Sequence, residues 1–170
     1  MEKVDIVDEN LKVLYQTTKQ HAHDNGLLHP TVIAEVVNSK GEWLLVKQAS
    51  HKQDPGQFVS PVGGHIGSGE SHENALKREA EEEIGLNGEI EHEYVDRKIY
   101  VRKWEKGSEN HFFIVYKIYS DKNPVLNDES VEYRWLKTDE IKKLLKENPN
   151  MFGYAFHFVV KNFFSKLFLD

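Results

Sequence analysis

The feature that most constrains this sequence is the segment "GGHIGSGESHENALKREAEEEIGL", which runs from Gly63 to Leu86. Its first part is rich in glycine and predicts a turn. Its second part predicts a helix that Ser71 can cap and Gly85 can end. This helix carries four glutamates within the five positions 79–83. Like charges on neighbouring turns cost roughly a few tenths of a kcal/mol per pair, so the arrangement needs something that offsets the repulsion.

The helical period gives a physical reason for the glutamates. At about 100° per residue, Leu76, Ala80 and Ile84 form a narrow apolar stripe. Three glutamates fill the neighbouring arc and border the buried face: Glu79, Glu82 and Glu83. Partly buried carboxylates hold protons unless cations neutralise them, and Mg²⁺ or Mn²⁺ would bind such carboxylates together with substrate phosphate oxygens. The charge run alone also fits a solvated helix face, so the surrounding residues must decide.

Composition limits the remaining classes of protein. The 170 residues include 39% hydrophobic and 29% charged residues, which predicts a single domain, 1–170. The chain contains no cysteine, which excludes disulfides, thiolate metal sites and cysteine nucleophiles. A net charge of −6 argues against a nucleic-acid polymer as partner. The first residues lack the pattern of a signal peptide, which predicts a cytoplasmic location.

The order of apolar runs predicts a mixed sheet with helices on both faces, an α/β fold. Residues 1–29 predict an N-terminal extension made of a hairpin and a short helix. The runs "TVIAEVV" and "EWLLVKQ" predict a central hairpin, and two later strands should pair. Residues 150–170 predict one amphipathic helix that covers the sheet or a subunit contact, so a homodimer stays open and a membrane span is not expected.

The segment 64–86 resembles the Nudix box, GX5EX7REUXEEXGU, in which U is an aliphatic residue. Leu86 fills the last place, and Ala80 stands where a larger aliphatic residue is usual. The other specified positions match: Gly64, Glu70, Arg78, Glu79, Glu82, Glu83 and Gly85. The sequence is therefore similar to the Nudix (MutT-like) hydrolases.

This resemblance implies an α/β/α sandwich and hydrolysis of a nucleoside diphosphate linked to another group, with Mg²⁺ or Mn²⁺ as cofactor. It implies that the metal ligands are Glu79, Glu82 and Glu83, with the backbone carbonyl of Gly63 as a further ligand. It also implies that Arg78 orients a glutamate and that Glu70 braces the loop, with Gly64 and Gly85 as structural glycines of the box. The catalytic base varies in this family, and four candidates stay open: Glu79, Glu82, Glu109 and Glu129.

A second resemblance is more specific. The stretches "VDIVDEN", "HAHDNGLLHP" and "GGHIGSGES" resemble the Nudix subgroup that includes type 1 isopentenyl diphosphate isomerase. Its cysteine acid aligns with Gly63, and its glutamate pair aligns with Glu109 and His111. Two of its metal-binding histidines match His29 and His65, and His23 lies near another, which leaves a second metal site open.

The interpretation that follows is a metal-dependent Nudix hydrolase that cleaves a diphosphate bond in a small organic molecule. Without a cysteine, isomerase activity is disfavoured, and a binding module of the same fold without turnover is the other alternative. The substrate-binding candidates are Phe58, which precedes the glycine loop, and His65, Glu109 and His111.

Overall fold

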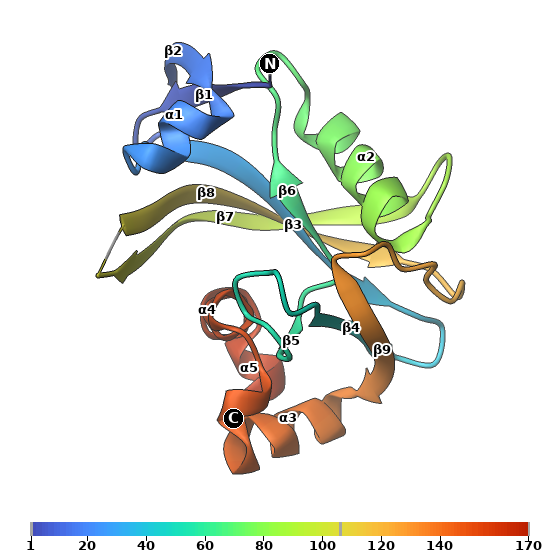
Figure 1. Ribbon diagram of the computed structural model, residues 1–170. Helices are drawn as coiled ribbons and strands as arrows, with labels where there is room; N and C mark the ends of the chain where they lie inside the picture. The colour runs from blue at the N-terminus through green and yellow to red at the C-terminus, as the bar shows by residue number, and fades with distance from the viewer. Residues whose placement is uncertain (1, 106, 170) are drawn as a thin grey trace.

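A mixed β-sheet lies between two helical layers (Figure 1). The structure is a computed structural model that describes residues 2–105 and 107–169. Helix α2 covers one face of the sheet, and α3, α4 and α5 cover the other (Figure 1). The strands of this sheet are β3 (His29–Val37), β4 (Glu42–Gln48), β5 (Phe58–Val59), β6 (Val62–His65), β7 (Glu91–Trp104), β8 (Gly107–Tyr119) and β9 (Ser130–Lys137). The α/β fold predicted from the sequence is confirmed.

The pairing of β3 places the glycine strand next to the centre of the sheet. The main strand order is β5-β4-β3-β8-β7, and β6 and β9 pair with β3 and β4 respectively. Strand β3 runs parallel to β8 and antiparallel to β6, with Thr31 opposite His65 and Ile33 opposite Gly63. The expected hairpin of β3 and β4 and the expected pair of β7 and β8 both form. The box segment is thereby fixed to a central strand.

Side chains of the central strands alternate between two cores, as the period of two in a strand requires. Val32 and Val36 of β3 face the core under α2 (His72–Ile84), whereas Ile33 faces the core under the C-terminal helices. In β8, Ile114 and Val115 divide in the same way. Apolar burial on both faces therefore holds the sheet and positions α2.

The N-terminal segment folds as β1 (Lys3–Val7), β2 (Val13–Thr18) and the short helix α1 (Lys19–Asp24). The side chain of Thr18 caps α1 by accepting a hydrogen bond from the backbone N–H of His21 at 3.1 Å. This segment lies beside the start of β3 (Figure 1), and the N–H of Val7 donates to the carbonyl of Leu28 at 3.0 Å. The position brings α1 close to the start of the central strands.

The C-terminal region differs from the single helix expected over 150–170. Helix α3 (Thr138–Glu147) is followed by a 3-10 turn (Pro149–Met151) and two helices, α4 (Tyr154–Phe163) and α5 (Ser165–Phe168). The chain leaves helical geometry at Phe164, so that the rings of Phe164 and Phe168 both pack edge-on against Trp43. Within residues 2–105 and 107–169, no helix is long and apolar enough to cross a membrane.

Candidate active site

The helix α2 begins and ends where the local sequence signals it. Ser71 precedes the helix, and its Oγ accepts from the N–H of Asn74 at 3.1 Å. Gly85 ends it with φ at 69°, the left-handed region that glycine tolerates best. The predicted stripe, which includes Leu76 and Ala80, is buried against the sheet. The glutamates beside this stripe are consequently held at the edge of the core.

Arg78 connects the box loop to the box helix. Its Nε and Nη2 donate to the two carboxylate oxygens of Glu70, each at 2.9 Å, and Nη1 donates to Glu79 at 2.7 Å. Nη2 also donates to the backbone carbonyl of His65 at 2.9 Å. Such charge-assisted, bidentate contacts fix direction as well as distance. One guanidinium therefore sets the positions of the loop, of β6 and of a glutamate.

Glu79 lies directly against the glycine strand. It is only 9% exposed, and a Cβ placed on Gly64 would lie 2.2 Å from its carboxylate. Burial raises the pKa of Glu79 to about 7, although the Arg78 guanidinium acts in the opposite direction. Position 64 therefore has to be glycine if this carboxylate is to pack there.

Glu83 is fixed from the other side of the same strand segment. Its Oε2 accepts from the backbone N–H of Gly63 at 2.7 Å, and burial raises its pKa well above the usual range. Glu82 differs from both neighbours because its side chain is 56% exposed, with Oε2 3.7 Å from Arg78 Nη1. The box thus combines the buried carboxylate of Glu79, the half-buried one of Glu83 and the exposed one of Glu82.

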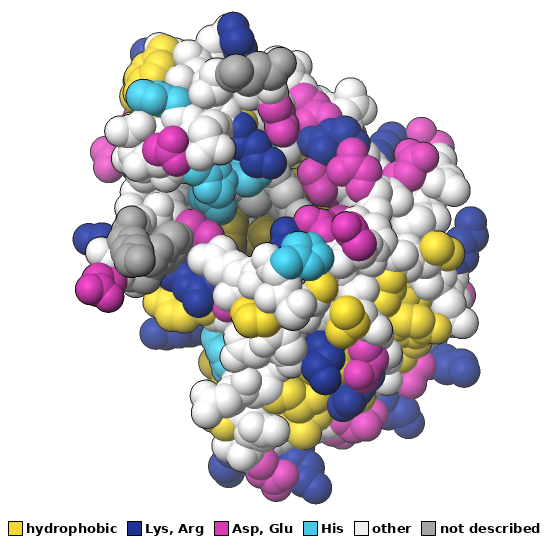
Figure 2. All heavy atoms as spheres, in the orientation of Figure 1, with side chains coloured by type: hydrophobic (Ala, Val, Ile, Leu, Met, Phe, Trp, Pro, Cys, Tyr) yellow, Lys and Arg dark blue, Asp and Glu magenta, His cyan; other side chains and the backbone are white. Residues whose placement is uncertain are grey.

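A cavity of about 370 Å³ opens beside this helix. Figure 2 shows a hollow on this face, bordered by histidine side chains on one side and by acidic side chains on the other. Gly63 and Gly64 form part of the wall together with Glu83, and the opposite part includes His23, His65 and His111. An acidic region and an imidazole region therefore share one cleft.

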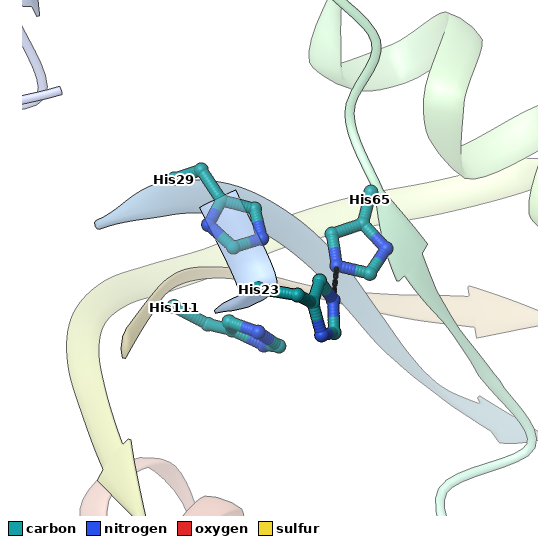
Figure 3. Close-up of side chains that lie close together, drawn as sticks. All are labelled: His23, His29, His65 and His111. Carbon is teal, nitrogen blue, oxygen red and sulfur yellow. Dashed lines mark hydrogen bonds between the residues drawn. The ribbon is translucent and has the colours of Figure 1, made fainter. Parts of the chain in front are cut away.

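The four histidines on the second side converge, although they come from four elements (Figure 3). They are His23 of α1, His29 of β3, His65 of β6 and His111 of β8. One possible ligand atom from each lies within 4.8 Å of those of all the others. Nε2 of His23 and Nε2 of His65 are 2.9 Å apart (Figure 3). Burial lowers the pKa of His65 to about 2 and that of His111 to about 3, so both rings are neutral near pH 7.

The remaining sequence candidates separate into two groups. Glu109 and Glu129 line the cavity, and Glu129 accepts from Lys52 Nζ at 2.8 Å, a contact that lowers its pKa. Phe58, in contrast, is 2% exposed and belongs to the core under the C-terminal helices. The expectation that Phe58 lines the cleft is wrong, because its ring points into that core.

Sequence reasoning missed three further groups near the cavity. Arg102 of β7 donates to Asp54 at 3.1 Å, and both side chains line the wall, as does Tyr100. Nothing local marks these residues, because Asp54 lies in an ordinary loop and the other two lie in a long alternating strand. The residue pattern around His111 predicted a strand. It did not predict that three histidines from other elements would lie next to this residue.

Comparisons with known proteins identify the family of this chain. The family model of the NUDIX domain matches residues 27–157. The chain is 31% identical over 150 residues to an uncharacterized Nudix hydrolase of Nostoc sp. (strain PCC 7120), which covers 86% of this chain and 87% of that one. It is 29% identical over 175 residues to an isopentenyl-diphosphate Delta-isomerase of Aliivibrio fischeri, with 98% and 97% covered.

The fold is also similar to that of solved structures. The crystal structure of DR0079 from Deinococcus radiodurans matches with a TM-score of 0.74 at 22% identity, over 94% of this chain and 98% of that chain. The site is a cleft with acidic side chains, and it lies beside the loop after β6 and the helix α2. The chain belongs to the NUDIX domain family, and its enzyme class is that of the Nudix hydrolases.

Proposed function

We propose that this protein is a metal-dependent Nudix hydrolase that cleaves a diphosphate bond in a nucleoside diphosphate derivative or a related organic diphosphate. The observation that carries the proposal is the set of three box glutamates on α2, of which Glu83 lines the cavity. Arg78 holds Glu79, the Gly63 N–H holds Glu83, and Glu82 projects toward solvent. Glu79 and Glu83 therefore offer acceptor oxygens at fixed positions, and Glu83 lines a space that a small molecule can enter.

The residues present fit a divalent cation. The buried Glu79 and the half-buried Glu83 have raised pKa values and are costly to ionise unless positive charge is supplied, and Arg78 is already shared between Glu70 and Glu79. Hard cations such as Mg²⁺ and Mn²⁺ prefer oxygen ligands of this kind. Glu79, Glu82 and Glu83 would hold the ion, together with the carbonyl of Gly63. When bound, such an ion neutralises phosphate oxygens and lowers the pKa of water.

The protein side chains then have separate tasks. Arg78 keeps the box glutamates in place, and Glu70 holds the guanidinium and the loop by accepting from it and from the N–H of Gly67 at 3.0 Å. The proton of the attacking water needs a carboxylate acceptor within hydrogen-bond reach. Besides Glu79 and Glu82 of the box, Glu109 and Glu129 on the cavity wall stay candidates for this base.

The isomerase relative raises a second candidate function, since it covers 98% of this chain. The sequence contains no cysteine, and Gly63 stands where the resemblance places the isomerase acid. The backbone N–H of Gly63 is occupied by Glu83, and the residue has no side chain that could deliver a proton to carbon. Hydrolysis is therefore the function that the site supports best.

A substrate panel tests the proposal. The purified chain would be incubated with nucleoside di- and triphosphates, sugar nucleotides, dinucleoside polyphosphates and isoprenoid diphosphates, and release of phosphate or nucleoside monophosphate would be measured. We expect turnover of at least one class with Mg²⁺ or Mn²⁺ and its loss after chelation. Turnover that persists unchanged in the chelator would contradict the metal dependence.

A further inference from the structure

The loop between β6 and α2 is held by the N-terminal strand β1 as well as by the sheet. The N–H of Ser68 donates to the carbonyl of Lys3 at 2.9 Å, and Val4 forms an antiparallel bridge with Gly67. The side chain of Ser68 also donates from Oγ to Oδ1 of Asp5 at 2.6 Å. Figure 1 shows the start of β1 beside this loop. Three consecutive residues of β1 therefore contact the loop that leads into the box helix.

This loop, residues 66–70, needs an external contact because its own backbone is weakly constrained. It contains Gly67 and Gly69, and Gly69 has φ at 78°. Glycine has the widest backbone freedom of any residue, so a loop with two glycines loses more entropy when it takes a single shape. The sheet holds the loop at its first residue, where the N–H of Ile66 donates to the carbonyl of Pro30 at 3.2 Å. The contacts with β1 restrict the part that follows.

Strand β1 is itself a fixed support. Val4 is fully buried and Ile6 is 5% exposed, and both pack in a small core with Ala22 of α1 and with Leu27. Successive side chains of a strand point to opposite faces, so Asp5 points away from this core. Its half-buried carboxylate meets the loop on that other side. The loop is thus tied to a strand that apolar packing holds in place.

The loop in turn contacts the box side chains. The N–H of Gly67 donates to Oε1 of Glu70 at 3.0 Å, and the same carboxylate accepts two hydrogen bonds from Arg78. Arg78 then donates to Glu79 at 2.7 Å. A shift of Ser68 would move the adjacent Gly67, and with it the carboxylate that aligns the guanidinium. Each step of this path is a direct hydrogen bond or a peptide link.

We propose that Asp5 is a positioning residue for the hydrolysis. By accepting from Ser68, it keeps the loop in the shape in which Glu70 aligns Arg78. Hydrogen bonds to an ionised acceptor are short and strong, which suits a carboxylate to this task. The NUDIX family model begins at residue 27, so β1 lies outside the segment that it matches. The inference rests on the proposed function, because it assigns to β1 a share in placing the box glutamates.

The first test is the turnover of Asp5→Ala, measured on the full chain well below its melting temperature. Misplacement of a reacting group by about 1 Å can cost 10²-fold in rate, and Asp5 acts through intermediates, so we expect kcat to fall by roughly 5–20-fold. KM should change by less than ~2-fold, since binding of the ground state is kept. Asp5→Asn retains an oxygen that accepts from Ser68, and it should recover most of the turnover.

The same hairpin offers a matched control in Asp8→Ala. Oδ1 of Asp8 accepts from the N–H groups of Asn10 and Lys12 at 2.8 and 2.9 Å, in the turn between β1 and β2. This variant should lose stability without a loss of kcat. A fall in kcat that is equal in Asp5→Ala and Asp8→Ala would show that the hairpin acts through stability alone, and it would overturn the inference.

A double-mutant cycle with Ser68→Ala assigns the effect to one contact. Ser68→Ala removes the hydroxyl that Asp5 accepts from, so it should lower kcat as Asp5→Ala does. If the two side chains act through their mutual hydrogen bond, the double variant should be no slower than either single variant. Fully additive losses would mean that Asp5 acts through some other contact, which would contradict the proposal.

Two further measurements need no substrate. In the metal-free protein, the amide protons of Gly67 and Ser68 should exchange at least ~10-fold faster in Asp5→Ala than in the wild type, and Asp8→Ala should leave them unchanged. Mn²⁺ titration should show an affinity weakened by roughly 3–10-fold, less than the 10–100-fold typical of direct partners of a metal ligand.

These readouts separate the inference from the proposed function. Exchange and Mn²⁺ affinity that are both unchanged in Asp5→Ala would refute the inference, even if the wild type hydrolyses a diphosphate. Faster exchange with wild-type kcat would refute it as well. If the wild type hydrolyses nothing in the panel but both changes occur, the proposed function fails, while the changes still support placement of the box by Asp5.

Discussion

At the scale of single residues, Arg78 has the most contacts to account for. It is bound to Glu70 through two parallel hydrogen bonds, to Glu79 through a third, and to the carbonyl of His65 through a fourth. A lysine could not reproduce this planar arrangement. The residue acts on the reaction through the glutamates that it holds, so it is a positioning residue.

Replacing Arg78 tests that role. In Arg78→Ala, Glu79 loses its fixed direction, and misplacement of a ligand by about 1 Å can cost 10²-fold in rate. We expect kcat to fall by roughly 10–100-fold, with a smaller change in the affinity for Mg²⁺. Steady-state kinetics and metal titration measure the two effects. Lys77→Ala, which removes a surface pair with Glu89, is the control, and an equal loss in both variants would contradict the assignment.

Glu35 is a second residue whose chemistry follows from burial. Its side chain is fully buried, Ser60 Oγ donates to Oε1 at 2.5 Å, and Oε2 has no partner. Burial raises the pKa of Glu35 to about 7, so the carboxyl is protonated at lower pH. Because the folded-state pKa lies above the unfolded value of about 4.5, this group favours folding below pH 4.5, and that contribution is lost as the pH rises through 7.

The pH dependence gives a testable outcome for Glu35→Gln. The variant keeps the shape without the charge, so it should gain stability relative to the wild type between pH 5 and pH 8, on the order of 3 kcal/mol. Urea unfolding at both pH values measures the difference, with the exposed Glu91→Gln as control. A difference that is the same at pH 5 and pH 8 would show that Glu35 is not the titrating group.

At the scale of elements, the contact between β6 and α2 decides the geometry of the site. The ends of α2 were predictable because Ser71 and Gly85 act within one turn of the helix. The division of the C-terminal region into α4 and α5 was not predictable, because it depends on the contact of Phe164 and Phe168 with Trp43, more than 100 residues away in the chain. Local sequence signals thus set where a helix begins and ends, whereas tertiary packing decides whether a helix is broken within its length.

The close approach of β6 to α2 can be tested by a substitution that adds one methyl group to β6. In Gly64→Ala the new Cβ would lie 2.2 Å from the Glu79 carboxylate, which Arg78 prevents from moving freely. We expect at least a ~10-fold loss of turnover and a loss of about 1–3 kcal/mol of stability. Gly67→Ala is the matched control, since its Cβ would make only ordinary contacts, with Glu70 Oε1 at 3.5 Å and Glu70 Cβ at 3.8 Å. Similar results for both variants would refute the packing argument.

At the scale of the whole molecule, one cleft combines an acidic wall and a histidine wall. Of the acidic wall, Glu83 was predictable from the box pattern, and Glu109 and Glu129 were candidates, whereas Asp54 was not predicted. The histidine cluster was only partly predictable: the resemblance suggested His23, His29 and His65, but His111 joins them through the parallel pairing of β3 and β8, which no local pattern encodes. The same pairing places His29 directly opposite His111.

The whole-molecule similarity to an isomerase leads to a negative prediction. The protein should not interconvert isopentenyl and dimethylallyl diphosphate, because Gly63 has no proton to give to an apolar carbon. Gly63→Cys alone should not create the activity, since His111 stands where the isomerase has a glutamate. An NMR assay of the two isomers with Mg²⁺ and Mn²⁺ measures this. Interconversion well above that of a Glu82→Gln control would reverse the assignment.

The most direct measurement of the central claim is the turnover of Glu82→Gln on a substrate identified by the panel. Glu82 is exposed, so the substitution should leave the melting temperature of the metal-free protein nearly unchanged. Loss of one negative ligand charge next to the reacting phosphate should lower kcat by at least ~100-fold in saturating Mg²⁺. Near-normal turnover by this variant would contradict the role assigned to the box glutamates.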